Sequence, residues 1–143
     1  MDFEIRSEKW QESIDITEGV QKAIDNLWEK ERKLICNKKA RVALVYCPHT
    51  TGGITVNEGS DNNVMLDVLD AIDEITPRLD FRHKEGNSMS HIKASLVGSS
   101  VMIPLEIKGD KWEKVKLGLG TWQKIFFMEF DGPRKRKIII SIF

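Results

Sequence analysis

Three histidines are the residues of this sequence best suited to chemistry, because an imidazole binds metal ions and exchanges protons near neutral pH. His49, His83 and His91 all lie in the middle third of the chain, each beside polar residues and near the expected end of a helix or strand. Three imidazoles around a zinc ion with one open position lower the pKa of bound water to about 7. The spacing is not that of a local zinc motif, so a metal site requires the fold to gather the three rings. The alternative is that each histidine is a hydrogen-bonded structural residue.

Hydroxyl and carboxylate groups follow the first of these histidines closely. Thr50 and Thr51 come directly after His49, and Glu58 and Asp61 come after the next expected strand. Groups of this kind orient a metal-bound histidine or bind Mg²⁺ themselves. For Glu58 and Asp61, capping of the next helix is an equally good interpretation, because acidic side chains are favoured in the first turn of a helix.

Two further segments are suited to binding phosphate. Asn87 is expected at the beginning of a helix, where free backbone N–H groups bind anions. Arg134 and Arg136 follow Glu129 and Asp131 across a turn, and a guanidinium binds phosphate through two parallel hydrogen bonds. The Asp-Gly-Pro sequence of this turn is also an ordinary turn signal, beside which basic side chains are simply solvated.

Helices and strands must bring these groups together. Apolar residues at helical spacing, with capping and stop signals, predict three helices, and alternating or continuous apolar runs predict strands. The expected helices run from 17 to 30, from 60 or 61 to 77, and from 87 or 88 to 98. The expected strands are two short stretches within 2–16 and the runs 41–48, 54–58, 100–107, 118–130 and 136–143.

One of these strands is apolar on both faces. In the run 124–130, Ile125 and Phe127 point to one face and Phe126, Met128 and Phe130 point to the other. Neither face is therefore expected to be fully solvated, and an oligomer interface would explain the surplus of apolar residues. Trp122 follows flexible glycines just before this run, and we expect it to line the wall of a pocket, since a buried indole N–H needs a partner. The run 41–48 is expected to be a central strand with both faces covered.

The composition narrows the classes of protein. The 143 residues hold 22 basic and 22 acidic side chains, so the net charge is zero and nucleic-acid binding is not expected. No signal peptide or membrane span is recognisable, which predicts a cytoplasmic protein that does not bind membranes. Cys36 and Cys47 are too far apart for a Cys-x-x-Cys pair and are expected to be buried free thiols. The length predicts one domain, residues 1–143.

Four separated stretches of the sequence resemble the YjbQ family, which is named for a secondary thiamine-phosphate synthase activity. They are DIT before the first helix, HTTGGITVNEGSD, HKEGNSMSHIKASLVGSS and LGTWQKIFFMEFDGPRKRKIII, and their order and spacing agree over almost the whole chain. Gly53 is one departure, because the family commonly has alanine there. The resemblance implies an α+β fold, a single compact domain whose mostly antiparallel sheet is packed by two to three helices, and assembly into a homotrimer.

The resemblance also implies a function. The chain would be a weak thiamine-phosphate synthase, a transferase that joins a pyrimidine diphosphate to a thiazole phosphate and releases pyrophosphate. Catalytic roles would fall to His49, Glu58, Asp61 and Glu129. Phosphate binding would fall to Thr50, Thr51, Asn87, Arg134 and Arg136. A divalent metal, zinc or magnesium, would be bound by His49, His83 and His91.

Two alternatives stand beside the synthase. In the first, the three histidines hold a zinc-bound hydroxide that hydrolyses a phosphorylated small molecule, with Glu58 as the base. In the second, the protein is not an enzyme, and its polar cleft binds a phosphorylated small molecule in a trimer. All three hypotheses depend on the histidine rings meeting in one place.

Overall fold

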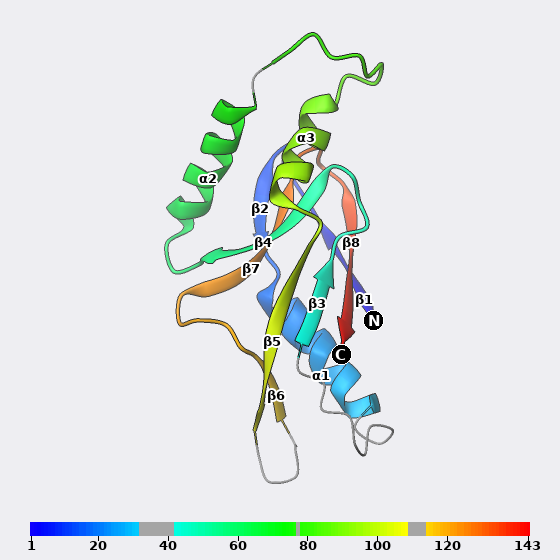
Figure 1. Cartoon of the computed structure of the whole chain (residues 1–143), viewed down its shortest axis with the longest axis vertical. Coiled ribbons are helices and arrows are strands. Elements are labelled where there is room, and N and C mark those ends of the chain that lie inside the picture. Colours follow the sequence, from blue (N-terminus) through cyan, green and yellow to red (C-terminus); the bar gives the residue numbers. More distant parts are fainter. Residues whose placement is uncertain (32–41, 77, 109–113) are drawn as a thin grey trace.

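Eight strands form two antiparallel sheets in the computed structural model, which describes residues 1–31, 42–76, 78–108 and 114–143 (Figure 1). The five-stranded sheet has the order β1 (Asp2–Arg6), β8 (Lys135–Ile142), β3 (Val42–Tyr46), β5 (Ser100–Lys108) and β6 (Lys114–Leu117). The three-stranded sheet has the order β2 (Glu12–Asp15), β7 (Gln123–Glu129) and β4 (Gly52–Glu58). Three helices complete the fold: α1 (Thr17–Glu31), α2 (Asn62–Ile75) and α3 (Ser88–Val97).

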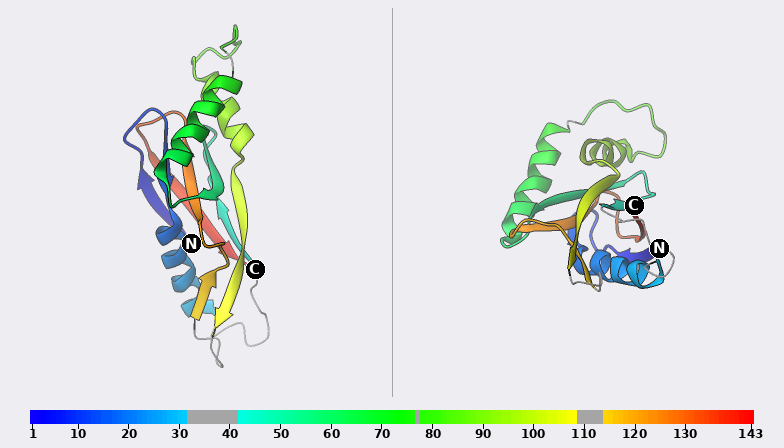
Figure 2. Two further views of the ribbon diagram at one scale, coloured as in Figure 1. Left: turned by 90° about the vertical axis from the view of Figure 1, so that its left-hand side faces the viewer. Right: turned by 60° about the horizontal axis from the view of Figure 1, so that its bottom comes forward.

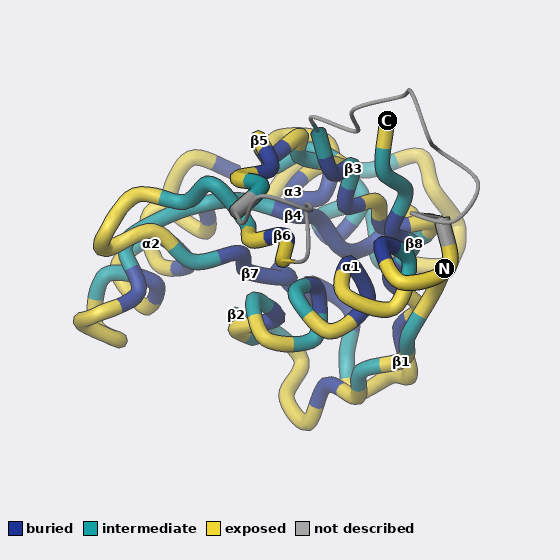
Figure 3. The backbone as a smooth tube through the Cα atoms, turned by 90° about the horizontal axis from the view of Figure 1, so that it is seen from below, coloured by how far each residue is buried: buried dark blue, intermediate teal, exposed yellow. Residues whose placement is uncertain are grey.

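α1 lies on one side of the smaller sheet, and α2 and α3 lie on the other side (Figure 2). On one side, Ile125 and Phe127 of β7 join α1 and the inner face of the five-stranded sheet in the main core. On the other side, Phe126, Met128 and Phe130 pack under α2 and α3 in a second core. Both faces of this strand are therefore buried within the chain (Figure 3), and its apolar surplus does not require an oligomer interface.

The helix boundaries follow local chemistry that the sequence displays. The Asp61 side chain accepts a hydrogen bond from the Asn63 N–H and caps α2, whose C-cap is Thr76. Gly98, which ends α3, has φ of +93°, a conformation that suits glycine, and its N–H donates to the Ala94 carbonyl. The three helix predictions are thus confirmed to within one or two residues.

The α+β fold class is confirmed, and three details differ from expectation. β6 was not predicted as a strand, and the last part of the run 118–130 alone forms β7, which begins at Gln123. β3 is central in its sheet, but Tyr46 on its outer face is 38% exposed, so only one face is fully covered. Cys47 is buried as expected, whereas Cys36 lies outside the described residues. None of the described helices is both long and apolar enough to span a bilayer.

Candidate functional site

His49 is held by the end of a β-ladder. Tyr46 of β3 pairs with Ile139 of β8, and continuing this register would place Pro48 opposite Lys137. The chain leaves the sheet at that point, and the His49 Nε2 atom accepts the Lys137 backbone N–H at 2.8 Å. The ring thus supplies the acceptor that a continuing strand would have supplied.

This hydrogen bond fixes the tautomer of His49. A backbone N–H only donates, so Nε2 is unprotonated and the neutral ring carries its hydrogen on Nδ1. Burial, followed by the nearby Arg136 guanidinium, lowers the pKa of His49 below its ordinary value of 6.5. Near neutral pH the ring therefore offers one N–H donor, at Nδ1.

His91 is held through the other ring nitrogen, Nδ1. It lies in the first turn of α3, and its Nδ1 atom is 3.1 Å from the Thr50 carbonyl oxygen. Since a carbonyl only accepts, Nδ1 carries a hydrogen, and in the neutral ring Nε2 is the acceptor nitrogen. The His83 ring stands edge-on to His91, with ring centroids 5.4 Å apart and an interplanar angle of 87°.

His49 and His91 line one cleft, which we call the imidazole cleft. It has a volume of about 620 Å³ and lies between the β3–β4 connection and α3. Its other lining residues that carry a hydroxyl group are Tyr46, Thr50, Ser95 and Ser99. The two serines were not predicted as site residues, because nothing in the sequence around them distinguishes them from other surface serines. His83 touches His91 but is not part of the lining.

A buried ion pair lies beside the cleft. The Arg136 guanidinium donates to both carboxylate oxygens of Glu129, at 2.5 and 2.7 Å, and to the Thr51 hydroxyl at 2.8 Å. Ser7 donates its hydroxyl hydrogen to the same carboxylate at 2.9 Å. Glu129 is 0% and Arg136 is 5% exposed, so both charges are out of contact with solvent. The structure places these two predicted site residues in mutual contact beneath the surface.

The turn between β7 and β8 and the start of α3 together carry a further group of hydrogen-bonded polar residues. Arg134 donates to the Asp131 carboxylate at 2.8 Å, and the Asn87 amide donates to the same carboxylate at 3.3 Å. This group adjoins the buried pair, because the Asp131 backbone N–H donates to Glu129 and the Arg134 N–H donates to Ser7. Most of the predicted site residues thus occupy one end of the molecule.

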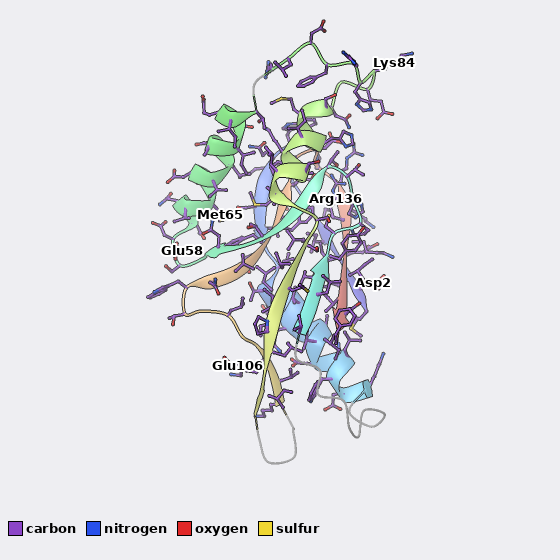
Figure 4. All side chains as sticks on the ribbon, viewed as in Figure 1. Asp2, Glu58, Met65, Lys84, Glu106 and Arg136 are labelled. Atoms are coloured by element: carbon purple, nitrogen blue, oxygen red, sulfur yellow. The ribbon has the colours of Figure 1, made fainter. Side chains whose placement is uncertain are left out.

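Glu58 and Asp61 lie elsewhere. Glu58 ends β4, whose first residue, Gly52, is next to Thr51, and a seven-residue strand spans about 20 Å. Figure 4 shows Glu58 well away from Arg136. The Glu58 carboxylate accepts hydrogen bonds from Ser60, and Asp61 caps α2. Within one chain these two acids are not part of the histidine site, and the capping interpretation is the one that the structure supports for Asp61.

The ligand set for a metal is incomplete. Among the described residues, no group of three or more His, Cys, Asp or Glu side chains is arranged to hold a metal ion. His91 is adjacent to His83 through ring contact and to His49 through the cleft, but the three rings do not converge on one point. The expected three-histidine zinc site is therefore not formed. Trp122 is not buried, since it is 64% exposed, and it does not line the imidazole cleft.

Sequence and structure comparisons identify the relatives of this chain. The family described as "UPF0047 protein YjbQ-like" matches residues 1–143. The chain belongs to the YjbQ family. A UPF0047 protein of Methanocaldococcus jannaschii is 41% identical over 98% of this chain and 91% of the relative, and the UPF0047 protein YugU of Bacillus subtilis is 41% identical over 98% and 96%.

Solved structures of YjbQ-family and similar proteins share the fold. The crystal structure of an uncharacterised YjbQ/UPF0047 protein from Clostridium acetobutylicum has a TM-score of 0.82 and 42% identity, covering 100% of this chain and 99% of that chain. A conserved hypothetical protein from Thermus thermophilus has a TM-score of 0.80 and 32% identity, covering 100% and 99%. The likeness therefore extends over the whole domain.

These findings correct the expected function. The relatives are named only as UPF0047 or uncharacterised proteins, and nothing in the comparisons supports thiamine-phosphate synthesis or another catalytic activity for the YjbQ-family chain. The expectation of a thiamine-phosphate synthase was wrong. The zinc hydrolase is not supported either, because His49, His83 and His91 are all described and do not form a group that could hold a metal ion.

The first prediction concerns the buried ion pair. Glu129→Gln leaves the Arg136 guanidinium buried beside a neutral amide, and we expect the free energy of unfolding to fall by about 3–5 kcal/mol. Urea unfolding followed by circular dichroism measures this. The same substitution at Glu58, whose hydrogen bonds lie at the surface, should change stability by less than about 0.5 kcal/mol. Equal effects at the two positions would show that the pair does not hold the sheets together.

The second prediction concerns His49 and pH. Because its pKa is lowered on folding, the unfolded chain binds more protons, so the contribution of His49 to stability is complete above the unfolded pKa of 6.5 and is lost as pH falls below it. His49→Gln keeps an acceptor for the Lys137 N–H without titrating, and its stability should fall less than that of the wild type between about pH 7.5 and about pH 5.5.

His49→Ala tests the hydrogen-bond acceptor role of His49 separately from the effect of its protonation. It leaves the Lys137 N–H without its acceptor and should be less stable than His49→Gln by about 1 kcal/mol at neutral pH. Denaturant unfolding of the three proteins at both pH values measures all of these differences. If the wild type and His49→Gln lose stability in parallel on acidification, His49 does not have the lowered pKa.

Proposed function

We propose that the protein binds a small phosphorylated molecule in the imidazole cleft. The observation that carries this proposal is the pair of fixed tautomers, since His49 offers an N–H donor and His91 offers an acceptor nitrogen on the same cleft. A phosphate group with one proton has both acceptor oxygens and an O–H donor. It can therefore accept from His49 and donate to His91.

The electrostatics and the size of the cleft support an anion. Burial is the main cause of the lowered pKa of His49; the charges of Arg136 and Lys137 also lower it, so both cations place a positive potential at this ring, and the charge of Glu129 opposes them. The volume of about 620 Å³ falls within the range of small-molecule sites. The hydroxyl groups of Thr50 and Ser99 line the same cleft and supply further donors to phosphate oxygens.

Titration with inorganic phosphate, monitored by the imidazole nitrogen resonances of ¹⁵N-labelled protein, tests this proposal. We expect saturable shifts at His49 and His91. His49→Ala removes the Nδ1–H donor at a cost of about 1 kcal/mol in stability, so it should still fold and should bind phosphate at least about tenfold more weakly.

Two further variants complete the phosphate test. His91→Ala removes the acceptor nitrogen and should weaken binding in the same way, whereas His83→Ala, outside the lining, should bind like the wild type. Shifts that do not saturate, or equal affinity in all variants, would refute a phosphate site at the two rings.

We also infer that the protein assembles as a homotrimer through the outer face of the five-stranded sheet. Leu44 and Tyr46 of β3 lie beside Met102 of β5 and Ile139 of β8 on this face, and Met102 is 73% exposed. Side chains of both signs border the apolar residues, as in the Asp2–Lys137 ion pair, so two copies need not repel each other.

Light scattering after size-exclusion chromatography measures the assembly. We expect the wild type to have three times the mass of one chain. Met102→Lys introduces a charge into the apolar face and should give a smaller species, because a buried unpaired ammonium is costly. Leu66→Lys, at another exposed apolar position on α2, should leave the mass unchanged. A wild-type monomer, or an intact Met102→Lys assembly, would contradict this interface.

A further inference from the structure

A second cavity lies against a different side of α3. It has a volume of about 810 Å³, is open to solvent, and is bordered by α2, α3, the segment from Arg78 to Asn87 and the connection between β1 and β2. It shares no lining residue with the imidazole cleft. We call it the α2–α3 cavity.

The α2–α3 cavity includes a closed polar cluster. Lys93 is 5% exposed, and its ammonium donates to the Gln11 side-chain oxygen at 2.7 Å and to the Asp73 carboxylate. Gln11 in turn donates to the other oxygen of Asp73 at 3.1 Å. The buried ammonium of Lys93 is therefore paired with Asp73, whose side chain is 49% exposed at the edge of the cavity.

Two other charged residues of the cavity have no such partner. Glu74 lies near the end of α2 and Arg78 follows shortly after it, and both are exposed. Across the parts of the chain that the structure covers, neither side chain makes an ion pair or a hydrogen bond with another described residue. The cavity thus presents one cation and one anion that are both available.

Large apolar side chains line the same cavity. Trp10 is 56% and Leu79 is 65% exposed, and Phe81 and Met89 complete this part of the lining. Exposed aromatic and aliphatic surface next to a hollow is typical of a place where another molecule binds, because covering it removes apolar surface from water.

We propose that the α2–α3 cavity binds a free amino acid with a large apolar side chain. The carboxylate pairs with Arg78, the ammonium pairs with Glu74, and the side chain packs against Trp10 and Phe81. A phosphate ester would be repelled by Glu74 and Asp73, and a neutral hydrocarbon would leave both free charges without a partner. A zwitterion with an apolar side chain is the class that uses all three features.

L-Phenylalanine is the probe that tests this site. In ¹⁵N-labelled protein, the indole N–H resonance of Trp10, assigned by its loss in Trp10→Phe, should shift and saturate as the probe is added. 3-Phenylpropionate lacks the ammonium and phenethylamine lacks the carboxylate, so each should bind at least about tenfold more weakly. Equal binding of both analogues would overturn the zwitterion assignment.

Surface variants locate the contacts. Arg78→Gln and Glu74→Gln should each weaken L-phenylalanine binding at least about tenfold, and neither changes a buried residue. His91→Ala, in the imidazole cleft, should leave the affinity unchanged, so this proposal and the phosphate proposal fail or succeed separately. No saturable shift of the Trp10 resonance, or full affinity in both charge variants, would overturn the proposal.

Discussion

The Glu129–Arg136 ion pair is the interaction on which the geometry of this domain depends. Glu129 ends β7 in one sheet and Arg136 lies in β8 of the other, so their hydrogen bonds join the two sheets at one end. Ser7, just after β1, and Thr51, just before β4, bind the same two groups. Because an unpaired buried charge is very costly, all of these strand ends must meet in this arrangement or the fold loses much of its stability.

The imidazole cleft takes its shape from the neighbours of this network in the sequence. Arg136 points inward, and the next residue, Lys137, offers the backbone N–H that holds His49. Thr51 binds Arg136, and the preceding residue, Thr50, offers the carbonyl that holds His91. The ring nitrogens that remain without a protein partner are therefore set by backbone groups next to Arg136 and Thr51 in the sequence, which is why this network and the imidazole cleft share one end of the molecule.

The parts of this structure that could be predicted from sequence are those with a local physical cause. The Asp61 cap and the apolar stripe of α2 are read from adjacent residues, and so is the double-sided apolar pattern of β7. The partner of Glu129 could not be predicted in this way. Residue type alone does not show whether a carboxylate and a guanidinium face a ligand or each other, since that depends on burial by distant strands. For the same reason the sequence could not show that Glu58 lies far from the histidines. Its position depends on the direction in which β4 runs away from Thr51.

α3 explains how one small domain can present two separate cavities. The helix has only ten residues, too few to be stable alone, so tertiary contacts must hold it. Ser90 donates to the Phe130 carbonyl at 2.5 Å, the Gly98 carbonyl accepts the Ile54 N–H, and His91 and Lys93 are fixed from different sides. Ser90, which anchors the helix, is next to His91 of the imidazole cleft, and Lys93 lines the α2–α3 cavity, so the position of α3 sets the shape of both. Both cavities therefore depend on the strand ends to which the helix is attached.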